Sequence, residues 1–383
     1  MLSFELSEEQ EILRRSIREF AEAEIKPKAI ELDEKEEFSL DTLKKMAEMG
    51  LFGMIVSEEY GGSNMGYISY IIAVEEIARV DGSHAATVAA GNSLGIYPIY
   101  RFGSEEQKRR WLPKLCAGEG LASFGLTEPN AGSDAGGTKT TAVKKGNDWV
   151  INGSKIFITN ASNPKAIITT VQTVTGARAD GKKEYTCFLV PHGTAGFSQK
   201  TMHGKLMWRS SDTAELYFDD CHVPSANMLG KQGEGFHQML KTLDGGRLSI
   251  AAMGLGGAQG AYEMALKYSR ERVQFGQPIS KNQAIAFKLA DMATEIEAAR
   301  WMLYRAAWLK ENEKPFEKEA AMAKLYCSEV FKRVATEAVQ IHGGYGLMKE
   351  YHVERFFRDQ KLLEIGEGTS EVQRIVISRK LGC

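Results

Sequence analysis

The sequence predicts an α+β protein of several domains, in which a helical domain is followed by a central antiparallel β domain and a C-terminal four-helix bundle. The chain has 383 residues, and a domain usually has about 100–200 residues, so two or three domains are expected. Apolar residues recur at helical spacing in the first and last thirds of the chain, whereas the middle third has short β-branched runs between turn residues. We therefore expect domains over residues 1–120, 121–232 and 233–383.

The first 120 residues are expected to form amphipathic helices. Ser7 stands three residues before Gln10, which is the spacing of a capping box, and apolar side chains then recur at helical intervals as far as Ile25. A second capping box is expected where Ser104 precedes Gln107. Further stretches with one apolar face are residues 40–50, 68–80 and 104–115.

Residues 121–232 are expected to form strands. Asn152-Gly153 stands between two apolar runs, 149–151 and 155–159, and predicts a hairpin because this dipeptide tolerates the positive φ of a type I′ turn. Further β-branched runs are residues 166–171, 185–190 and 214–218. No helical pattern separates the runs, so an antiparallel sandwich or barrel is favoured over a β-α-β sheet.

The last third of the chain has the strongest helical periodicity. Residues 283–312 form one long periodic segment and residues 317–341 another, with Pro315 just before the second. Long helices with short connections predict a four-helix bundle. The glycine-rich stretch 254–260 is only loosely similar to a dinucleotide-binding fingerprint, because its spacing is wrong and no strand precedes it. We interpret it as small residues that allow helices to pack closely.

The composition excludes several classes of function. Lys and Arg number 48 and Asp and Glu number 50, and the net charge of −2 argues against a nucleic-acid coat or a polybasic membrane binder. No apolar run approaches the roughly 20 residues of a membrane span, and the acidic N-terminus has no signal or transit pattern. The cysteines are scattered and form no CxxC pair, which argues against disulfides or a zinc site. We therefore expect a cytoplasmic protein with no membrane insertion, no nucleic-acid partner and no metal.

Four motifs rich in glycine and polar residues could carry chemistry, and each also has a purely structural interpretation. In residues 124–134 the amides around Gly132 and Ser133 could bind phosphate oxygens and Thr127 could offer a hydroxyl, or the segment could be a surface turn. In residues 340–346 the glycines could let a ligand approach the backbone, or they could end a helix.

The other two motifs each present one charged residue. Arg272, in residues 270–276, could bind a pyrophosphate through its guanidinium, or it could be a cation at the C-terminus of a helix. Glu367 is flanked by Gly366 and Gly368, so its carboxylate is little shielded and could act as a general base. It could also be a solvated loop residue that caps the following helix.

Taken together and in this order, the motifs closely resemble the acyl-CoA dehydrogenase family. The resemblance rests on residues 126–134, on residues 340–347 with the following Arg355 and Asp359, and on residues 367–374. It covers essentially the whole chain and is nearest to the short-chain, butyryl-CoA-type members. The family fold has the same α-β-α order, and its members are usually homotetramers built as a dimer of dimers.

The resemblance implies an FAD cofactor between the β domain and the C-terminal helices. Candidate contacts in the flavin-lining segment are Phe124, Leu126, Thr127, Gly132 and Ser133, and those in the second strand are Phe157, Ile158 and Thr159. Arg272 and Gln283 resemble residues that reach the FAD of a neighbouring subunit, and Phe275 belongs to the same set. The adenosine diphosphate end would be held by Gln340, Gly343 and Gly344, and the site would be completed by Thr369 and Glu371.

The reaction that the resemblance implies is α,β-dehydrogenation of an acyl-CoA thioester to the trans-2-enoyl-CoA. Glu367 would remove the α-proton while the β-hydrogen leaves as hydride to the flavin, and the electrons would pass to an electron-transferring flavoprotein. A desolvated pocket should raise the pKa of Glu367 towards neutrality. Candidate substrate contacts are Ser133, Asp244 and Arg247 for the CoA portion, and Gly91, Gly366 and Gly368.

Two positions depart from the family pattern and bear on the acyl group. The residue before the base is commonly Tyr in relatives but is Gly366 here, and Gly91 stands where a larger residue is often found. Because both changes remove volume, we hypothesise a wide pocket for a branched, alicyclic or aromatic acyl group. Val88 stands where glutaryl-CoA members have an Arg, which disfavours a glutaryl substrate. In the alternative a short straight chain binds and larger neighbours fill the space, the candidates being Trp208, Met207 and Tyr97.

Three alternatives from other classes remain. An acyl-CoA oxidase shares the fold and the base but passes electrons to oxygen, and its chain is usually much longer. A reductase that works on enoyl-CoA in reverse, within an electron-bifurcating complex, has the same residues. A nucleic-acid-binding relative would need a basic C-terminal region, yet residues 313–383 mix Glu and Lys without a lysine run.

Overall fold

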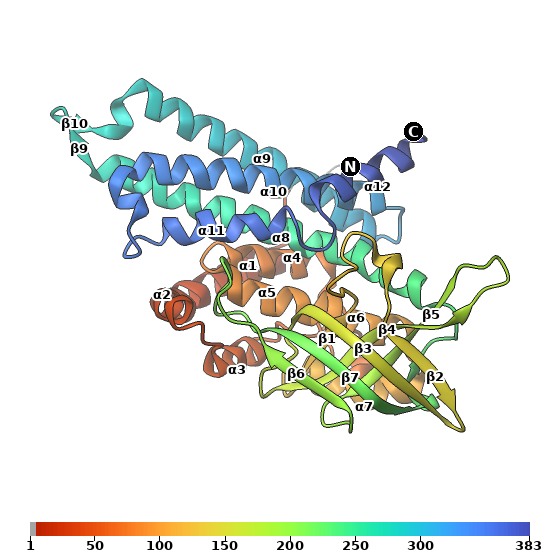
Figure 1. Cartoon of the computed structure of the whole chain (residues 1–383). Coiled ribbons are helices and arrows are strands. Elements are labelled where there is room, and N and C mark those ends of the chain that lie inside the picture. The colour runs from red at the N-terminus through yellow and green to blue at the C-terminus, as the bar shows by residue number, and fades with distance from the viewer. Residues whose placement is uncertain (1–4) are drawn as a thin grey trace.

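The computed structural model describes residues 5–383 and has the expected order of a helical domain, a β domain and a C-terminal helical domain (Figure 1). Both predicted capping boxes are confirmed, because the Ser7 and Ser104 hydroxyls each accept a hydrogen bond of 3.2 Å from the backbone amide three residues on. The first domain contains α1 (Glu8–Phe20), α2 (Lys26–Lys35), α3 (Leu40–Glu48), α4 (Gly66–Ala78), α5 (Gly82–Ala90), α6 (Tyr97–Phe102) and α7 (Glu105–Cys116). A π-helical segment, η3 (Gly91–Ile96), continues α5 into α6.

The described residues of the β domain form one eight-stranded sheet with the order β6-β7-β3-β2-β4-β5-β8, in which β1 pairs with β4. The strands are β1 (Leu121–Gly125), β2 (Thr141–Lys145), β3 (Asp148–Thr159), β4 (Ala166–Ala177), β5 (Lys183–Pro191), β6 (Phe197–Thr201), β7 (Thr213–Pro224) and β8 (Met228–Leu229). The long pairings are antiparallel as expected, but β1 runs parallel to β4. β2 and β3 separate β1 from β4 in the chain, so no hairpin requires these two strands to be antiparallel.

The predicted hairpin at Asn152-Gly153 is wrong, because β3 runs through both residues and the β2–β3 turn lies earlier, at Gly146 and Asn147. The pairing of β3 with β7 shifts register between Ile151 and Gly153, which marks a bulge. A Cβ at Gly153 would lie 2.6 Å from the Thr140 hydroxyl, so the glycine lets the residue before β2 approach β3 closely.

The C-terminal domain is built from long helices, and the predicted helices at 283–312 and 317–341 are confirmed. Its helices are α8 (Gly235–Glu271), α9 (Gln283–Glu311), α10 (Glu317–His342), α11 (Val353–Leu363) and α12 (Ser370–Leu381). Two short strands, β9 (Val273–Gln274) and β10 (Gln277–Pro278), connect α8 to α9. Across residues 5–383 each helix is too short or too polar to cross a bilayer.

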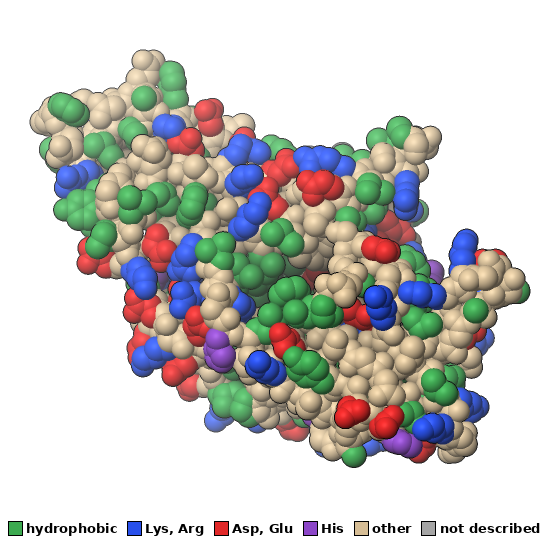
Figure 2. Space-filling model, in the orientation of Figure 1, with side chains coloured by type: hydrophobic (Ala, Val, Ile, Leu, Met, Phe, Trp, Pro, Cys, Tyr) green, Lys and Arg blue, Asp and Glu red, His purple; other side chains and the backbone are tan. Residues whose placement is uncertain are grey.

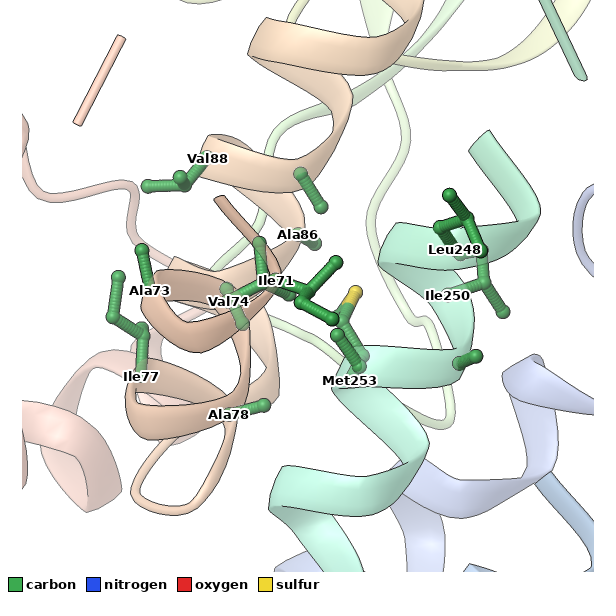
Figure 3. Packing of buried hydrophobic residues seen from close by; sticks show 14 of the residues in the cluster. Ile71, Ala73, Val74, Ile77, Ala78, Ala86, Val88, Leu248, Ile250 and Met253 are labelled. Atoms are coloured by element: carbon green, nitrogen blue, oxygen red, sulfur yellow. The ribbon is translucent and has the colours of Figure 1, made fainter. Parts of the chain in front are cut away.

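The glycines of residues 254–260 let α8 pack closely on its neighbours, as the sequence predicted. A Cβ at Gly254 would lie 3.0 Å from the Cys327 carbonyl oxygen of α10, and one at Gly256 would overlap the Glu75 carbonyl of α4. On the face of α8 towards the N-terminal domain, Met253 reaches Ile71 and Val74 of α4 (Figure 3). This packing makes the two helical domains share one hydrophobic core.

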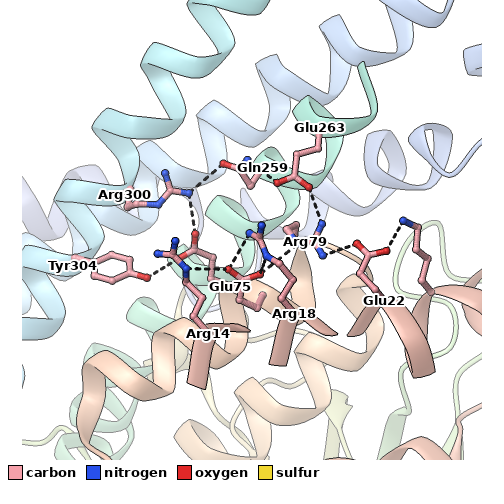
Figure 4. A network of polar contacts seen from close by, with 11 residues as sticks. Arg14, Arg18, Glu22, Glu75, Arg79, Gln259, Glu263, Arg300 and Tyr304 are labelled. Carbon is pink, nitrogen blue, oxygen red and sulfur yellow. Dashed lines mark hydrogen bonds and ion pairs between the residues drawn. The ribbon is translucent and has the colours of Figure 1, made fainter. Parts of the chain in front are cut away.

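A network of charged side chains joins α4 to the C-terminal helices (Figure 4). Glu75 accepts hydrogen bonds from Arg300 at 3.0 Å and from the Tyr304 hydroxyl at 2.9 Å, both on α9. Arg79, which is 8% exposed, donates to Glu263 of α8 at 2.7 Å. Buried charges need such partners, so the network fixes how α4, α8 and α9 meet.

Candidate active site

Glu367 lies in the connection between α11 and α12, where the backbone is left-handed. The φ angles are 52° at Glu367 and 91° at Gly368, a conformation that only glycine adopts without strain. Gln373 of α12 holds this turn, because its side-chain amide donates to the carbonyl of Glu367 at 3.2 Å and to that of Gly368 at 2.8 Å. Figure 2 shows hydrophobic side chains gathered between the C-terminal helices and the β domain, on the face that carries this connection.

The carboxylate of Glu367 packs on the backbone of α8. A Cβ at Gly246 would overlap Oε2 of Glu367, and Oε2 is buried with no hydrogen-bond partner. Burial raises the pKa of Glu367 to about 7, against the opposing positive charges of Lys324 and Arg247. The sequence also predicted that the pKa of Glu367 is raised. A carboxylate in this state is a base that works near neutral pH.

Asp244 and Arg247 lie on the same turn of α8 as Gly246. They form an ion pair with 2.6 Å between Oδ1 and Nη1, and the Arg247 side chain is only 6% exposed. Burial raises the pKa of Asp244, although Arg247 opposes the rise. Nε of Arg247 is buried and makes no hydrogen bond, so the guanidinium keeps a donor for a ligand.

The two candidate cofactor segments of the β domain lie side by side. The amide of Ile156 donates to the carbonyl of Thr127 at 2.9 Å, which joins the end of β3 to the loop after β1. Phe157 is 63% exposed with φ of 60°, next to an irregularity in the pairing with β7. The remaining residues divide by burial, with Phe124, Leu126 and Ile158 buried, Thr159 half-buried, and Gly132 and Ser133 exposed.

Glu128 gives the 124–134 motif a structural role as well. Its carboxylate accepts hydrogen bonds from the amides of Lys139 and Thr140 and from the ammonium of Lys155, at 2.7, 3.0 and 2.8 Å. Lys155 also donates to the Leu126 carbonyl at 3.1 Å. The buried ion pair therefore fixes the loop that holds the candidate flavin contacts.

The candidate cofactor residues between Arg272 and Gly344 lie at the far end of the long helices (Figure 1). Arg272, Gly343 and Gly344 line an open cavity of about 550 Å³. Nothing lies within 4 Å of a Cβ built on either glycine, so the backbone is accessible to a ligand there. Phe275, in the β9–β10 turn, is 95% exposed. Gln283 and Gln340 are also exposed, at the start of α9 and near the end of α10.

Several structural interpretations from the sequence are now resolved. Gly343 does end α10, with φ of 60°, and Arg272 follows the last residue of α8. Glu367 does not cap α12, because the Thr369 hydroxyl accepts the Val372 amide at 3.2 Å. Glu371 is exposed in the first turn of α12.

The candidate residues for the acyl group have different surroundings. At Gly91 a Cβ would lie 2.9 Å from the Phe52 ring, so an aromatic side chain already occupies that space. At Gly366 the nearest atom to a Cβ is the Leu362 carbonyl oxygen at 3.5 Å, which leaves room.

Sequence analysis missed Gly246 and Lys324. Gly246 carries no signal beyond its place next to Arg247. Lys324 does carry one, because it interrupts the apolar stripe of α10 that contains Ala320 and Cys327, and its side chain is fully buried. Its ammonium donates to the Gly368 carbonyl at 2.7 Å.

The pattern Gly91-Asn92-Ser93-Leu94-Gly95 matches the spacing of a serine-hydrolase nucleophile elbow. It lies in the π-helical segment η3 and not in a strand-to-helix turn. The Ser93 hydroxyl donates to the Ala89 carbonyl at 2.7 Å, so it is committed to the helix backbone.

The acyl-CoA dehydrogenase family matches the chain in all three parts. Its N-terminal domain matches residues 7–119, its middle domain residues 123–221 and its C-terminal domain residues 233–382. This chain belongs to the acyl-CoA dehydrogenase family. It is therefore related to oxidoreductases that act on acyl-CoA.

Relatives within the family align over their whole length. The chain is 53% identical over 380 residues to a probable acyl-CoA dehydrogenase, YngJ, of Bacillus subtilis, covering 99% of this chain and 100% of the relative. It is 47% identical, with the same coverage, to a short-chain specific acyl-CoA dehydrogenase of Clostridium acetobutylicum. It is 44% identical to an acryloyl-CoA reductase (NADH) of Anaerotignum propionicum, covering 99% and 96%.

Solved structures of family members have the same fold. Butyryl-CoA dehydrogenase from Megasphaera elsdenii superposes with a TM-score of 0.96 at 44% identity and full coverage of both chains. A chain in the structure of the electron transferring flavoprotein of Acidaminococcus fermentans gives 0.96 at 46%, covering 99% of each. An acyl-CoA dehydrogenase complexed with FAD from Bacillus anthracis gives 0.93 at 34%, covering 100% of this chain and 68% of that one.

Proposed function

We propose that this chain catalyses the FAD-dependent α,β-dehydrogenation of an acyl-CoA thioester to the trans-2-enoyl-CoA, with Glu367 as the base that removes the α-proton. The observation that carries the proposal is the state of the Glu367 carboxylate, whose Oε2 is buried and unpartnered and whose pKa burial raises to about 7. The α-proton of a thioester is only weakly acidic. A base whose pKa lies near the working pH accepts such a proton most effectively.

The chain supplies binding, orientation and electrostatics to this reaction. The backbone amide of Glu367 donates no hydrogen bond to any other of residues 5–383, so it is available for the thioester oxygen, on which negative charge develops. The unpartnered Nε of Arg247, on the same turn of α8 as Gly246, supports a role for this side chain in binding the CoA portion. The packing around Glu367 keeps water from Oε2 of its carboxylate.

Two groups of residues fit FAD. Phe157, Thr159 and the loop after β1 would lie against the flavin, and Arg272 with the open backbone at Gly343 would bind the phosphates and adenosine. When bound, FAD supplies the acceptor for the β-hydrogen as hydride. The two groups lie far apart within one chain (Figure 1), so we infer that each FAD is held by two copies of the chain, as in a homotetramer built from dimers.

We infer a short straight acyl chain as the preferred substrate. The relatives named short-chain specific and butyryl-CoA dehydrogenase support it. The wide-pocket hypothesis relied on Gly91 and Gly366, and Phe52 fills the space at Gly91. Only the space beside Gly366 still supports a branched or cyclic acyl group.

The acceptor and the direction of the reaction are also part of the proposal. We expect electrons to pass to an electron-transferring flavoprotein, which the match to a chain in the structure of such a flavoprotein supports. The reverse reaction, reduction of an enoyl-CoA, is the second candidate, because a relative of 44% identity is named an acryloyl-CoA reductase.

The test is the Glu367→Gln variant with butyryl-CoA and an artificial electron acceptor. It should purify yellow with FAD bound and lose about 10²–10⁴-fold in turnover, which is the usual contribution of a positioned base. Glu364→Gln is the matched control, because that carboxylate lies three residues away and pairs with Lys361 at 2.8 Å. Normal turnover in Glu367→Gln, or an equal loss in the control, would show that Glu367 is not the base.

A further inference from the structure

Lys324 is a buried cation directly beneath the turn that carries Glu367. It lies on the inward face of α10 and is 0% exposed. Its ammonium donates to the Gly368 carbonyl at 2.7 Å. Among residues 5–383 no carboxylate lies within 4.0 Å of it, so its charge is not consumed in an ion pair. A buried ammonium without an anionic contact is costly and therefore calls for a functional reason.

We propose that Lys324 is a positioning residue for Glu367, which holds the turn of the base through the Gly368 carbonyl and supplies the positive charge that keeps the buried carboxylate ionised and ready to accept a proton. The inference rests on the proposed function, in which Glu367 is the base. It adds that a residue on a different helix, Lys324 of α10, controls the ionisation state of that base.

The charges around Glu367 single out Lys324. The titratable groups that face Glu367 are Lys324 from α10, Arg247 from α8 and Tyr70 from α4. Arg247 is already paired with Asp244 at 2.6 Å, so much of its charge is neutralised. Burial raises the pKa of Tyr70, which keeps it uncharged. Lys324 is left as the unneutralised cation.

The charge of Glu367 in turn affects the pKa of Lys324. Burial lowers the pKa of Lys324 to about 8, and the charge of Glu367 is foremost among the effects that oppose this, with smaller contributions from Glu364 and Glu371. The pKa of Glu367 is about 7. The two groups therefore titrate as a coupled pair, and the anionic base beside a cationic Lys324 is favoured near neutral pH.

Gln373 allows the effect of the Lys324 charge to be distinguished from the effect of its hydrogen bond. Its neutral side-chain amide donates to the same Gly368 carbonyl at 2.8 Å and is itself fully buried. Loss of Gln373 would loosen the turn without removing a charge. Loss of Lys324 would remove both a hydrogen bond and the charge.

The experiment compares Lys324→Met, Lys324→Gln, Lys324→Arg and Gln373→Met in the FAD-loaded protein. The first readout is the infrared C=O band of the protonated Glu367 carboxyl, identified by its absence from Glu367→Gln and followed against pH. The second is the pH profile of kcat/KM for butyryl-CoA. Lys324→Gln keeps a hydrogen-bond donor for the Gly368 carbonyl. It therefore tests the loss of charge even if Lys324→Met fails to fold.

We expect the midpoint of the band and the acid limb of the profile to move up by at least about one pH unit in Lys324→Met and Lys324→Gln. One unit is tenfold in the ionised fraction, so kcat/KM should fall about tenfold below pH 7 and recover at higher pH. Lys324→Arg and Gln373→Met should leave both midpoints in place, whatever their effect on kcat. An unmoved midpoint in the neutral Lys324 variants, or the same shift in Gln373→Met, overturns the inference.

The infrared readout needs no turnover. If the band moves while no acyl-CoA is dehydrogenated, the proposed function fails and the coupling of Lys324 to Glu367 stands. If dehydrogenation proceeds while the band stays, the function stands and the inference fails.

Discussion

Gly246 of α8 and Glu367 of the α11–α12 connection are in such close contact that position 246 has no room for a side chain. A Cβ there would overlap Oε2 of Glu367. The helix backbone thus forms one wall of the site and fixes the carboxylate from one side, while the left-handed turn at Glu367 and Gly368 fixes it from the other. The position of the base therefore depends on Gly246, which has no side chain that could take part in the reaction.

Gly246→Ala should therefore displace the carboxylate while the protein remains folded. Misplacement of a reacting group by about 1 Å costs on the order of 10²-fold in rate, so we expect kcat to fall by about that factor with FAD still bound. The matched control is Gly245→Ala, whose Cβ would meet only the flexible end of Lys310. Rapid reduction of the flavin by butyryl-CoA measures the effect, and equal rates in the two variants would disprove this role of Gly246.

The raised pKa of Glu367 has a consequence for stability. Its folded-state pKa of about 7 lies above the unfolded value of 4.5, so the folded protein holds this proton more tightly. That contribution to stability is complete below pH 4.5 and is lost as the pH rises through 7. Each pKa unit corresponds to about 1.4 kcal/mol, so the loss is at most about 3.5 kcal/mol.

Glu367→Gln removes this dependence because the amide does not ionise. The variant should be more stable than the parent above pH 7, with the difference shrinking towards pH 5. Asp359, whose pKa burial raises to about 7, is present in both proteins and cancels in the comparison. Melting temperatures of the two FAD-loaded proteins between pH 5 and 9 measure the difference, and a difference that does not change with pH would contradict the raised pKa.

The two glycines linked to the acyl group should respond differently to a methyl group. Gly91→Ala places a Cβ 2.9 Å from the Phe52 ring and should destabilise the protein by about 1–3 kcal/mol, the usual cost of overpacking a core. Gly366→Ala meets no atom closer than 3.5 Å, so its stability should be unchanged. Urea unfolding of both variants tests this pair of expectations.

Activity then decides how wide the acyl pocket is. We expect the parent protein to favour butyryl-CoA over cyclohexanecarbonyl-CoA and a phenyl-substituted acyl-CoA in kcat/KM. If Gly366 borders the pocket, Gly366→Ala should lower the rate on the cyclic substrates more than the rate on butyryl-CoA. A parent protein that prefers the cyclic substrates would restore the wide-pocket hypothesis.

Local patterns were reliable where the structure they describe is local. Ser7 and Ser104 form capping boxes because cap and partner are three residues apart, and the long helices begin and end near the predicted residues. The Asn152-Gly153 hairpin failed because a bulge and a turn share the same residue preference, and only the contact with Thr140 distinguishes them. The parallel pairing of β1 with β4 likewise joins strands that are not consecutive, so no local turn signals it.

The sequence by itself determined the α-β-α order, the motifs that mark the family and the identity of the candidate base, since periodicity, turn residues and short motifs are written in consecutive residues. Only the tertiary structure decided what surrounds that base. Gly246, Lys324 and Glu367 come from three separate stretches of the chain, and the dryness and charge of the site arise where helices α8 and α10 meet the α11–α12 connection. A carboxylate has no raised pKa in an unfolded chain, because the desolvation that raises it exists only once distant segments have packed together.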